Sequence, residues 1–200
     1  MARKSNFDKD EKLVEAMQLF WQKGYANTSI SDLVDHLSIN RFSIYNTFGD
    51  KYALYQSALN YYFEHSTKPA SQVLFEPDAN LTTLKQFLEQ FAQRQKEQKF
   101  GCFIQNALLE HGISDENVHS IGEKLMNHLS DGVTNCLNNE VKGRNLNQQI
   151  DIQGLVDLTL VQIQGMRVLG KAKQYQRLDT ATQQFIELIQ ATFAMHQTHH

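Results

Sequence analysis

The sequence predicts an all-α protein of about nine helices, arranged as a small N-terminal head followed by a larger helical body. Only two prolines and ten glycines occur in 200 residues. Apolar residues recur at three- and four-residue spacing over long stretches, without the alternation typical of strands. A hydrophobic content of 41% is enough to bury a substantial core. The chain is therefore expected to be globular and helical throughout.

Three short helices are expected in the first fifty residues. The first covers residues 8–23 and ends at Gly24. Thr28 and Ser29 can cap a second helix, whose apolar face is formed by Ile30, Leu33, Val34 and Leu37. Residues 38–40 interrupt this helix, and Asn40 is a suitable N-cap for a third one over residues 41–47. The second and third helices form a helix-turn-helix pair at about residues 29–48.

The third helix is expected to turn Ile44 and Phe48 inward. Its outward side then carries a cation, hydroxyls, an amide and an aromatic ring, from Arg41, Phe42, Ser43, Tyr45 and Asn46. Such groups suit the phosphate oxygens and base edges of double-stranded DNA. The pair of helices is therefore a candidate DNA-reading element.

Two stretches of this region resemble the TetR family (the tetracycline-repressor or AcrR type) of bacterial transcription regulators. Residues 13–33, LVEAMQLFWQKGYANTSISDL, are similar to the family's first helix, its Lys-Gly-Tyr corner and its Thr-Ser entry into the second helix. Residues 43–51, SIYNTFGDK, are similar to its recognition helix and the start of its fourth helix. The resemblance implies a DNA-binding domain over residues 1–50 and an effector-binding and dimerisation domain over residues 51–200.

The resemblance also implies roles for individual residues. Phosphate contacts are implied for Thr28, Tyr45 and Lys51, with Ser29 among the DNA-binding residues, and groove contacts are implied for Arg41, Phe42, Ser43 and Asn46. Two positions depart from the family's usual pattern. Ser38 stands where the family has glycine at a left-handed turn, which costs about 1 kcal/mol. Phe42 replaces a small residue, and its ring is expected to alter base preference by packing on a thymine methyl.

Charge gives this region no broad attraction for DNA. Over residues 1–51, seven basic residues are matched by seven acidic ones. Because non-specific affinity depends on phosphate neutralisation, we expect weak binding to random DNA and reliance on specific contacts doubled by dimerisation. Arg3 and Lys4, ahead of the first helix, could add phosphate or minor-groove contacts.

Six more helices are expected in the body. One joins head and body over residues 51–65, and a proline-containing break follows over residues 68–80. The others are expected over residues 81–99, 103–110, 116–142, 151–173 and 179–196. The segment from Tyr52 to Phe103 holds ten of the twenty aromatic residues. In the body of a TetR-like protein these helices surround a cavity for an apolar or planar effector, which implies a pocket lined by Tyr61, Tyr62, Phe63, Phe87, Phe91, Phe103, Met126 and Met166.

The helix over residues 151–173 is apolar around nearly its whole circumference, so it must be buried on two sides. The last helix has a second apolar face as well. Together they resemble the four-helix contact of TetR-like dimers, which implies an interface at Leu155, Thr159, Gln162, Met166, Phe185, Ile189 and Phe193. A central core helix is the competing interpretation. A dimer is also what a helix-turn-helix protein needs to bind a pseudo-palindromic operator.

Cys102 follows Gly101 at the expected start of a short helix, where the helix dipole can lower the pKa of a thiol. Some TetR-like regulators with a Gly-Cys pair at a similar place respond to electrophiles or oxidants, so Cys102 is a candidate redox sensor. A small buried thiol without reactivity is the alternative.

No phosphate-binding loop, paired catalytic carboxylates or nucleophile motif occurs, so neither an enzyme nor a cofactor is expected. His111, Asp115 and His119 have metal-ligand spacing, but Gly112 interrupts the helix they would need, so no metal is expected. No apolar run approaches the ~18 residues of a membrane span, and we expect a cytoplasmic protein. The sequence thus predicts a DNA-binding repressor, a homodimer released from operator DNA by a small-molecule effector. The alternatives are a thiol sensor of the same family and a helical binding protein without an operator.

Overall fold

The computed structural model describes residues 7–144, 146 and 150–195, and all regular elements in this part of the chain are helical. The all-α prediction is confirmed. The contacts divide the chain into two compact units. The first unit comprises the residues up to Thr67 together with Cys102–Leu125, and the second comprises Lys68–Gly101 and the residues from Met126 onward.

Helix α1 (Lys9–Lys23) begins at Asp8, whose carboxylate accepts hydrogen bonds from the backbone N–H groups of Asp10 and Glu11. Its inner face buries Leu13, Ala16, Met17, Leu19 and Phe20. The helix ends at Gly24, whose φ of 82° is a conformation that residues with a side chain rarely adopt. The predicted end of this helix is confirmed, and the helix begins one residue later than predicted because Asp8 is its N-cap.

The caps of the next two helices are those expected from the sequence. Helix α2 (Ile30–Leu37) begins with a capping box, in which the Ser29 hydroxyl and the Asp32 carboxylate each accept the other residue's backbone N–H. Helix α3 (Arg41–Phe48) begins at Asn40, whose side chain accepts from the N–H of Ser43. Between them Ser38 is left-handed, with φ 53° and ψ 34°.

Helix α4 (Lys51–Tyr62) is capped by Asp50 and continues into a π-helical turn, η1 (Phe63–Thr67), instead of staying α-helical to His65. Helix α7 (Phe103–His111) packs against α4 and belongs to the same unit. The first turns of α8 (Glu116–Gly143) complete this unit, and the rest of α8 belongs to the second one. The predicted head therefore folds as one body with α7 and the start of α8.

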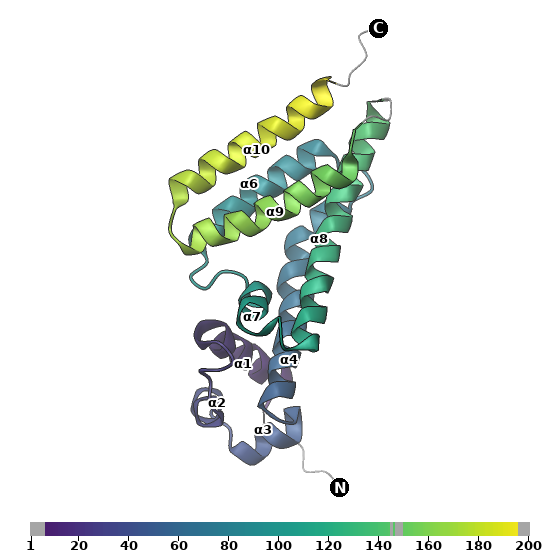
Figure 1. The fold of residues 1–200 in the computed structure, drawn as a ribbon. Coiled ribbons are helices and arrows are strands. Elements are labelled where there is room, and N and C mark those ends of the chain that lie inside the picture. The colour runs from purple at the N-terminus through teal and green to yellow at the C-terminus, as the bar shows by residue number, and fades with distance from the viewer. Residues whose placement is uncertain (1–6, 145, 147–149, 196–200) are drawn as a thin grey trace. The chain divides into compact units, whose positions relative to one another are not determined.

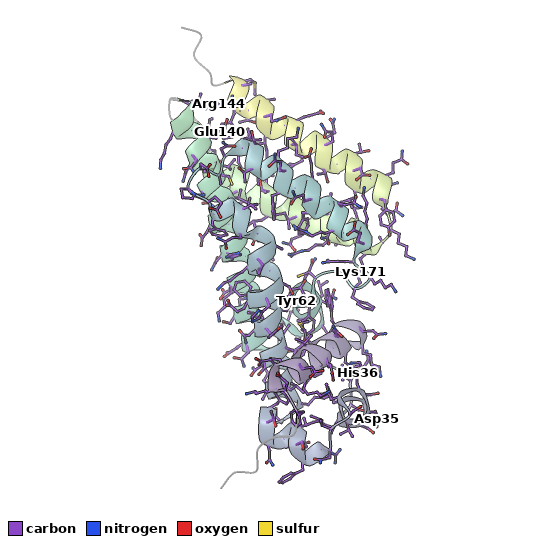
Figure 2. The ribbon with its side chains drawn as sticks, turned by 180° about the vertical axis from the view of Figure 1, so that it is seen from behind. Asp35, His36, Tyr62, Glu140, Arg144 and Lys171 are labelled. Carbon is purple, nitrogen blue, oxygen red and sulfur yellow. The ribbon has the colours of Figure 1, made fainter. Side chains whose placement is uncertain are left out.

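In the second unit, α6 (Leu81–Glu97), α9 (Ile152–Lys171) and α10 (Tyr175–Met195) lie side by side (Figure 1) and contact one another pairwise. The first turn of α6 is held by Glu140 of α8, which accepts from the N–H of Leu81 and pairs with Arg144. Figure 2 labels Glu140 and Arg144 near the end of α8. A Cβ at Gly170 would lie 2.7 Å from the backbone oxygen of Gln95, so this glycine permits the close approach of α9 to α6.

Two further predicted segments differ from the structure by more than two residues. The proline-containing break is partly helical, because α5 (Lys68–Ser71), which contains Pro69, follows η1 directly and is followed in turn by η2 (Gln72–Phe75). Helix α10 begins at Tyr175, four residues before the predicted Asp179; its predicted last residue, His196, lies outside the described residues, as do Arg3 and Lys4. The predicted boundary at residue 50 separates a DNA-binding domain from an effector-binding and dimerisation domain by function, and it stays a prediction.

Candidate nucleic-acid interface and effector site

The outer side of α3 presents the side chains predicted to read DNA. Phe42 is 74% exposed and Tyr45 44% exposed, whereas Ile44 is fully buried and Phe48 nearly so. Arg41 and Asn46 are exposed and Ser43 is half-buried. Phe42 lies on the eight-residue helix α3 with its ring in solvent. Packing this ring against an apolar group of a partner would remove apolar surface from water, which is favourable. The side chains on this face have the chemistry needed for base edges and phosphates.

The described cations of the head are mostly engaged within the head. Lys12 pairs with Glu15 at 2.9 Å and Lys23 pairs with Asp32 at 2.7 Å. Arg41 has no ion pair with any described residue, so its guanidinium is available to a phosphate or a guanine. The weak electrostatic attraction expected from the sequence is therefore concentrated at α3.

Thr28 and Lys51, two of the predicted phosphate contacts, have internal roles instead. Thr28 is fully buried, and its hydroxyl donates to the carbonyl oxygen of Gly24 at 2.7 Å. Lys51 Nζ donates to the carbonyl oxygens of Tyr25 and Thr28 at 3.0 and 2.8 Å and lies 4.1 Å from the centre of the Tyr25 ring. A phosphate accepts hydrogen bonds only, so donors already used on these carbonyls leave little for it. The two residues fix the corner that precedes α2.

Ser29 is exposed, but its hydroxyl is also engaged, since it donates to Asp32 at 2.6 Å. Hydrogen bonds from Lys23 and Ser29 lower the pKa of Asp32 well below its usual range. The carboxylate therefore remains charged as the cap of α2. Ser29, like Thr28, acts in this structure by shaping the start of α2.

The Gly24–Tyr25 corner is also held by α7, through a residue that the sequence did not single out. The Glu110 carboxylate accepts the backbone N–H groups of Tyr25 and Ala26 at 3.3 and 2.9 Å. A Cβ on Gly24 would lie 3.0 Å from a Glu110 oxygen, so glycine leaves the space for this contact. We call these contacts the Glu110 latch. Glu110 is 84 residues from Ala26 in sequence, and no local pattern signals such a pair.

A second contact joins α4 to the start of α8 within the same unit. The Tyr52 hydroxyl donates to Asp115 at 2.6 Å, and Asp115 also accepts the N–H groups of Asn117 and Val118. Partial burial opposes ionisation of Asp115, but these hydrogen bonds outweigh it and lower its pKa. Among the described residues, no group of three His, Cys, Asp or Glu side chains has the arrangement of a metal site. Asp115 caps α8 and ties it to α4.

Four of the predicted effector residues belong to the first unit. Tyr62 and Phe103 pack edge to face on each other, at 5.9 Å between ring centres, and Trp21 contacts both rings. Phe63 is buried, and Tyr61 stacks on His65 at 4.1 Å. Tyr62 and Phe103 thus form an aromatic core beneath α1.

The other four belong to the second unit. Phe87 and Phe91 lie 5.9 Å apart along α6, and Met166 is fully buried. The sulfur of Met126 accepts a hydrogen bond from the side-chain amide of Gln164 at 3.5 Å. That the eight side chains line one effector pocket remains a prediction.

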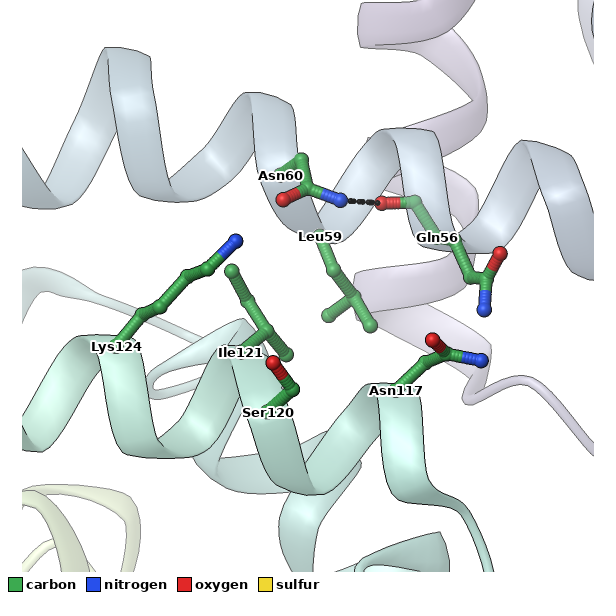
Figure 3. A pocket seen from close by; sticks show the side chains of 7 residues that line it. All are labelled: Gln56, Leu59, Asn60, Asn117, Ser120, Ile121 and Lys124. Atoms are coloured by element: carbon green, nitrogen blue, oxygen red, sulfur yellow. Dashed lines mark hydrogen bonds between the residues drawn. The ribbon is translucent and has the colours of Figure 1, made fainter.

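The described pocket of the first unit has a different character. It lies between α4 and the start of α8, has a volume of about 140 Å³, and is lined by Gln56, Leu59, Asn60, Asn117, Ser120, Ile121 and Lys124 (Figure 3). Asn60 bonds the backbone oxygen of Gln56 at 2.9 Å across one wall. Most of this lining is polar and exposed. Such a shallow site does not suit the apolar effector expected from the sequence.

The residues predicted for the dimer interface differ in exposure, and the interface stays a prediction. Thr159, Met166, Ile189 and Phe193 are buried within their own unit and expose almost no surface to a partner. Leu155, Gln162 and Phe185 are half-buried at the edge. The exposed apolar side chains lie on a neighbouring face of each helix. They are Leu158, Val161 and Val168 of α9 and Leu188 and Met195 of α10, all between 56 and 76% exposed. The periodicity was ambiguous because α9 is apolar on all sides.

Both cysteines are buried and unpaired. Cys102 is 5% exposed and is the N-cap residue of α7. Burial raises the pKa of the Cys136 thiol to about 12, and its sulfur lies against the carbonyl of Leu74. Cys136 is therefore a buried thiol that stays protonated in the core.

The fold and the outer face of α3 define a helix-turn-helix protein of the regulatory class. Residues 13–63 match the sequence model of a family described as bacterial regulatory proteins, tetR family. The chain is 30% identical over 133 residues to YezE of Bacillus subtilis (strain 168), an uncharacterized HTH-type transcriptional regulator, covering 66% of this chain and 69% of that protein. It is 32% identical over 103 residues to the HTH-type transcriptional repressor ComR of Escherichia coli (strain K12), covering 50% of this chain and about half (49%) of that protein.

Solved structures are similar in fold. A cysteine mutant of the TetR family regulator CifR, complexed with a 26 bp double-strand operator DNA, superimposes with a TM-score of 0.79 at 21% identity, over 93% of this chain and 98% of that chain. The reduced form of E. coli NemR gives a TM-score of 0.75 at 17% identity, over 88 and 95% of the two chains. The chain belongs to the tetR family of bacterial regulatory proteins. It is a DNA-binding transcriptional regulator, which confirms the main functional prediction.

Proposed function

We propose that the protein is a repressor, which binds a pseudo-palindromic operator as a symmetric dimer and leaves it when a small-molecule effector binds. The observation that carries this proposal is the outer face of α3, where Arg41, Phe42, Tyr45 and Asn46 are exposed together on a helix fixed from behind by Ile44 and Phe48. The Arg41 guanidinium, which has no ion pair with any described residue, and the Asn46 amide suit base edges, and the Phe42 ring suits a thymine methyl. We place its action in the cytoplasm, where the operator would be accessible.

The Glu110 latch and η1 give the proposed release a structural route. An effector acts by binding better to a form in which the two recognition helices no longer match successive major grooves. Helix α4 holds α3 at one end and continues into the π-helical turn at the other, and such turns are common at functional sites. Glu110 holds the corner before α2 from α7. A shift of α4 or α7 would therefore reach both helices of the reading pair.

The first test is selection of bound sequences from a random double-stranded DNA library at near-physiological salt. We expect an inverted repeat to be recovered by the wild type, and no enrichment by the double variant Arg41→Ala/Asn46→Ala. Gln86→Ala, an exposed position on α6, serves as the matched control and should recover the same repeat. Recovery of no sequence by folded, dimeric wild type would overturn the operator function.

Thiol chemistry at Cys102 is a second candidate for the release signal. Cys102 caps the same nine-residue helix that carries Glu110 near its other end, so a modification there would act on the latch. Its exposure of 5% argues for slow reaction in the folded protein. Treatment with N-ethylmaleimide should release operator DNA from wild type but not from Cys102→Ser if this candidate holds. Unchanged operator binding by fully alkylated protein would exclude it.

A further inference from the structure

Arg167 is a buried cation for which the described residues supply no counter-charge. It lies on α9 between the buried Met166 and the apolar end of the helix, and only 7% of the residue is exposed. Its Nη1 donates to the side-chain oxygen of Gln164 at 2.9 Å, and its guanidinium lies 5.6 Å from the centre of the Phe91 ring. These are all of its polar and ring contacts with the described residues. No described carboxylate pairs with it.

Two other cations of the second unit illustrate the usual pairing with an acidic partner. Arg144 pairs with Glu140, and Lys96 pairs with Asp179 at 2.6 Å, although both cations are more exposed than Arg167. An arginine side chain stays protonated in proteins, so it cannot avoid the cost of burial by losing its charge. A buried cation with one neutral hydrogen bond is unfavourable unless something else supplies the counter-charge.

The surroundings of Arg167 indicate the chemistry of a molecule that would supply the counter-charge. The Phe91 ring is near two guanidinium groups, since Arg94 is 5.8 Å and Arg167 5.6 Å from its centre. The amide of Gln164 donates to the sulfur of Met126, which turns its oxygen toward Arg167 and fixes the guanidinium beside thioether and aromatic groups. The Nε and Nη2 donors of Arg167, a parallel pair that matches a carboxylate, have no acceptor among the described residues.

We propose that Arg167 binds the carboxylate of the effector, and that the effector is an organic acid with an aromatic or aliphatic body. The inference rests on the proposed effector function and names its ligand class. The carboxylate supplies the missing charge, Phe91 and the two methionines Met126 and Met166 contact the apolar body, and Gln164 holds the guanidinium in position.

The test compares paired acids and amides in a buffer free of phosphate. The probes are benzoate, phenylacetate, hexanoate and decanoate, each against its primary amide, with sodium sulfate as a general anion control. Thermal unfolding and calorimetric titration are measured for wild type, Arg167→Met and Arg177→Met, the last being an exposed arginine on α10. At about 100 times its Kd, a bound acid should raise the Tm of wild type and Arg177→Met by roughly 5–10 °C. Arg167→Met should lose this rise, and the amides and sulfate should give none.

The stability of the variants without ligand tests whether the fold itself neutralises Arg167, and this test does not require the natural ligand to be known. If no protein group neutralises Arg167, then Arg167→Met should unfold at the same temperature as wild type or about 2 °C or more above it. A lower Tm for Arg167→Met than for Arg177→Met would overturn the inference, because Arg167 would then be stabilised by the fold itself. Equal shifts from acids and amides, acid binding retained by Arg167→Met, or no shift from any acid would overturn it too. Acid binding without operator selection would instead overturn the repressor proposal alone.

Discussion

At the scale of single residues, Arg41 is the cation on which DNA affinity should depend most. It is exposed on α3 and unpaired among the described residues, whereas Lys23 is paired with Asp32 and Lys51 with backbone carbonyls. We expect Arg41→Ala to weaken operator binding by about 1–3 kcal/mol per half-site if it reads a guanine. If it contacts a phosphate instead, the slope of log Kd against log salt should fall by about 0.9 per half-site.

Fluorescence anisotropy with labelled operator between 50 and 200 mM salt distinguishes these two roles. Lys23→Ala is the control, because its ammonium is already engaged within the head. Full affinity and an unchanged salt slope in Arg41→Ala would place the DNA contacts elsewhere.

Ser38 shows how a local departure from a sequence pattern becomes strain. The turn between α2 and α3 requires a left-handed residue, and serine occupies it with φ 53°. We expect Ser38→Gly to raise the free energy of unfolding by roughly 0.5–1 kcal/mol, since glycine removes the clash of the β-carbon. Urea unfolding of wild type and Ser38→Gly measures this difference in the free energy of unfolding. Gln86→Gly, in the interior of α6, should lower stability by a similar amount, and the same sign for both variants would refute the explanation.

At the scale of elements, the Glu110 latch makes α7 part of the reading head. Glu110→Gln keeps one side-chain oxygen as an acceptor but removes its charge, so we expect the N–H bonds of Tyr25 and Ala26 to weaken by about 1 kcal/mol. Hydrogen exchange at these two amides should accelerate severalfold, and operator affinity should fall. Glu123→Gln, an exposed change on α8, should leave both unchanged. Unaltered exchange at Tyr25 and Ala26 in Glu110→Gln would show that the corner is rigid without the latch.

Two capping carboxylates predict how the first unit responds to acid. The pKa values of Asp32 and Asp115 are lowered in the folded protein by their hydrogen bonds. A lowered pKa means that the unfolded state binds protons more readily, so their stabilisation is full above the ordinary aspartate pKa of about 3.9 and is lost as pH falls below it. Urea unfolding from pH 7 to pH 3 should show this loss. Asp115→Asn should reduce it, and an identical pH profile for wild type and Asp115→Asn would contradict the assignment.

At the scale of the whole molecule, dimerisation decides whether weak half-site contacts become a stable complex. The head carries no net charge, so one half-site should bind feebly. The exposed apolar side chains of α9 and α10 offer a surface that two copies of the chain could bury together, as a two-fold dimer requires. We expect the dimer to form through these exposed side chains, because the residues named from the sequence are largely buried within their own unit.

We expect Val161→Glu combined with Leu188→Glu to convert the protein to a monomer, because two buried carboxylates per protomer would lack partners. Sedimentation velocity measures the change, and operator affinity should fall at least 100-fold with it. Leu109→Glu is the matched control, since Leu109 is 78% exposed in the first unit. A dimer that persists in the first variant and dissociates in Leu109→Glu would move the interface to α7.

The local parts of the fold were predictable because their causes are local. Asp8, Ser29 and Asn40 cap the helices that begin beside them, and Gly24 ends α1 where a positive φ is needed. The family resemblance is carried by the same segment. The outward residues of α3 were predictable for this reason, whereas the roles of Thr28 and Lys51 were not, because their hydrogen-bond partners depend on how the corner folds.

By itself the sequence determined the helical class, the reading pair of helices and the family, since each follows from spacing and capping within a few residues. Only the tertiary structure decided which apolar side of α9 is exposed in the single chain, that Glu110 holds the corner 84 residues before it, and that Arg167 is buried without a counter-charge among the described residues. Burial and charge pairing are properties of residues brought together from distant parts of the chain. Periodicity reports that a helix has an apolar side, but it does not report what that side meets.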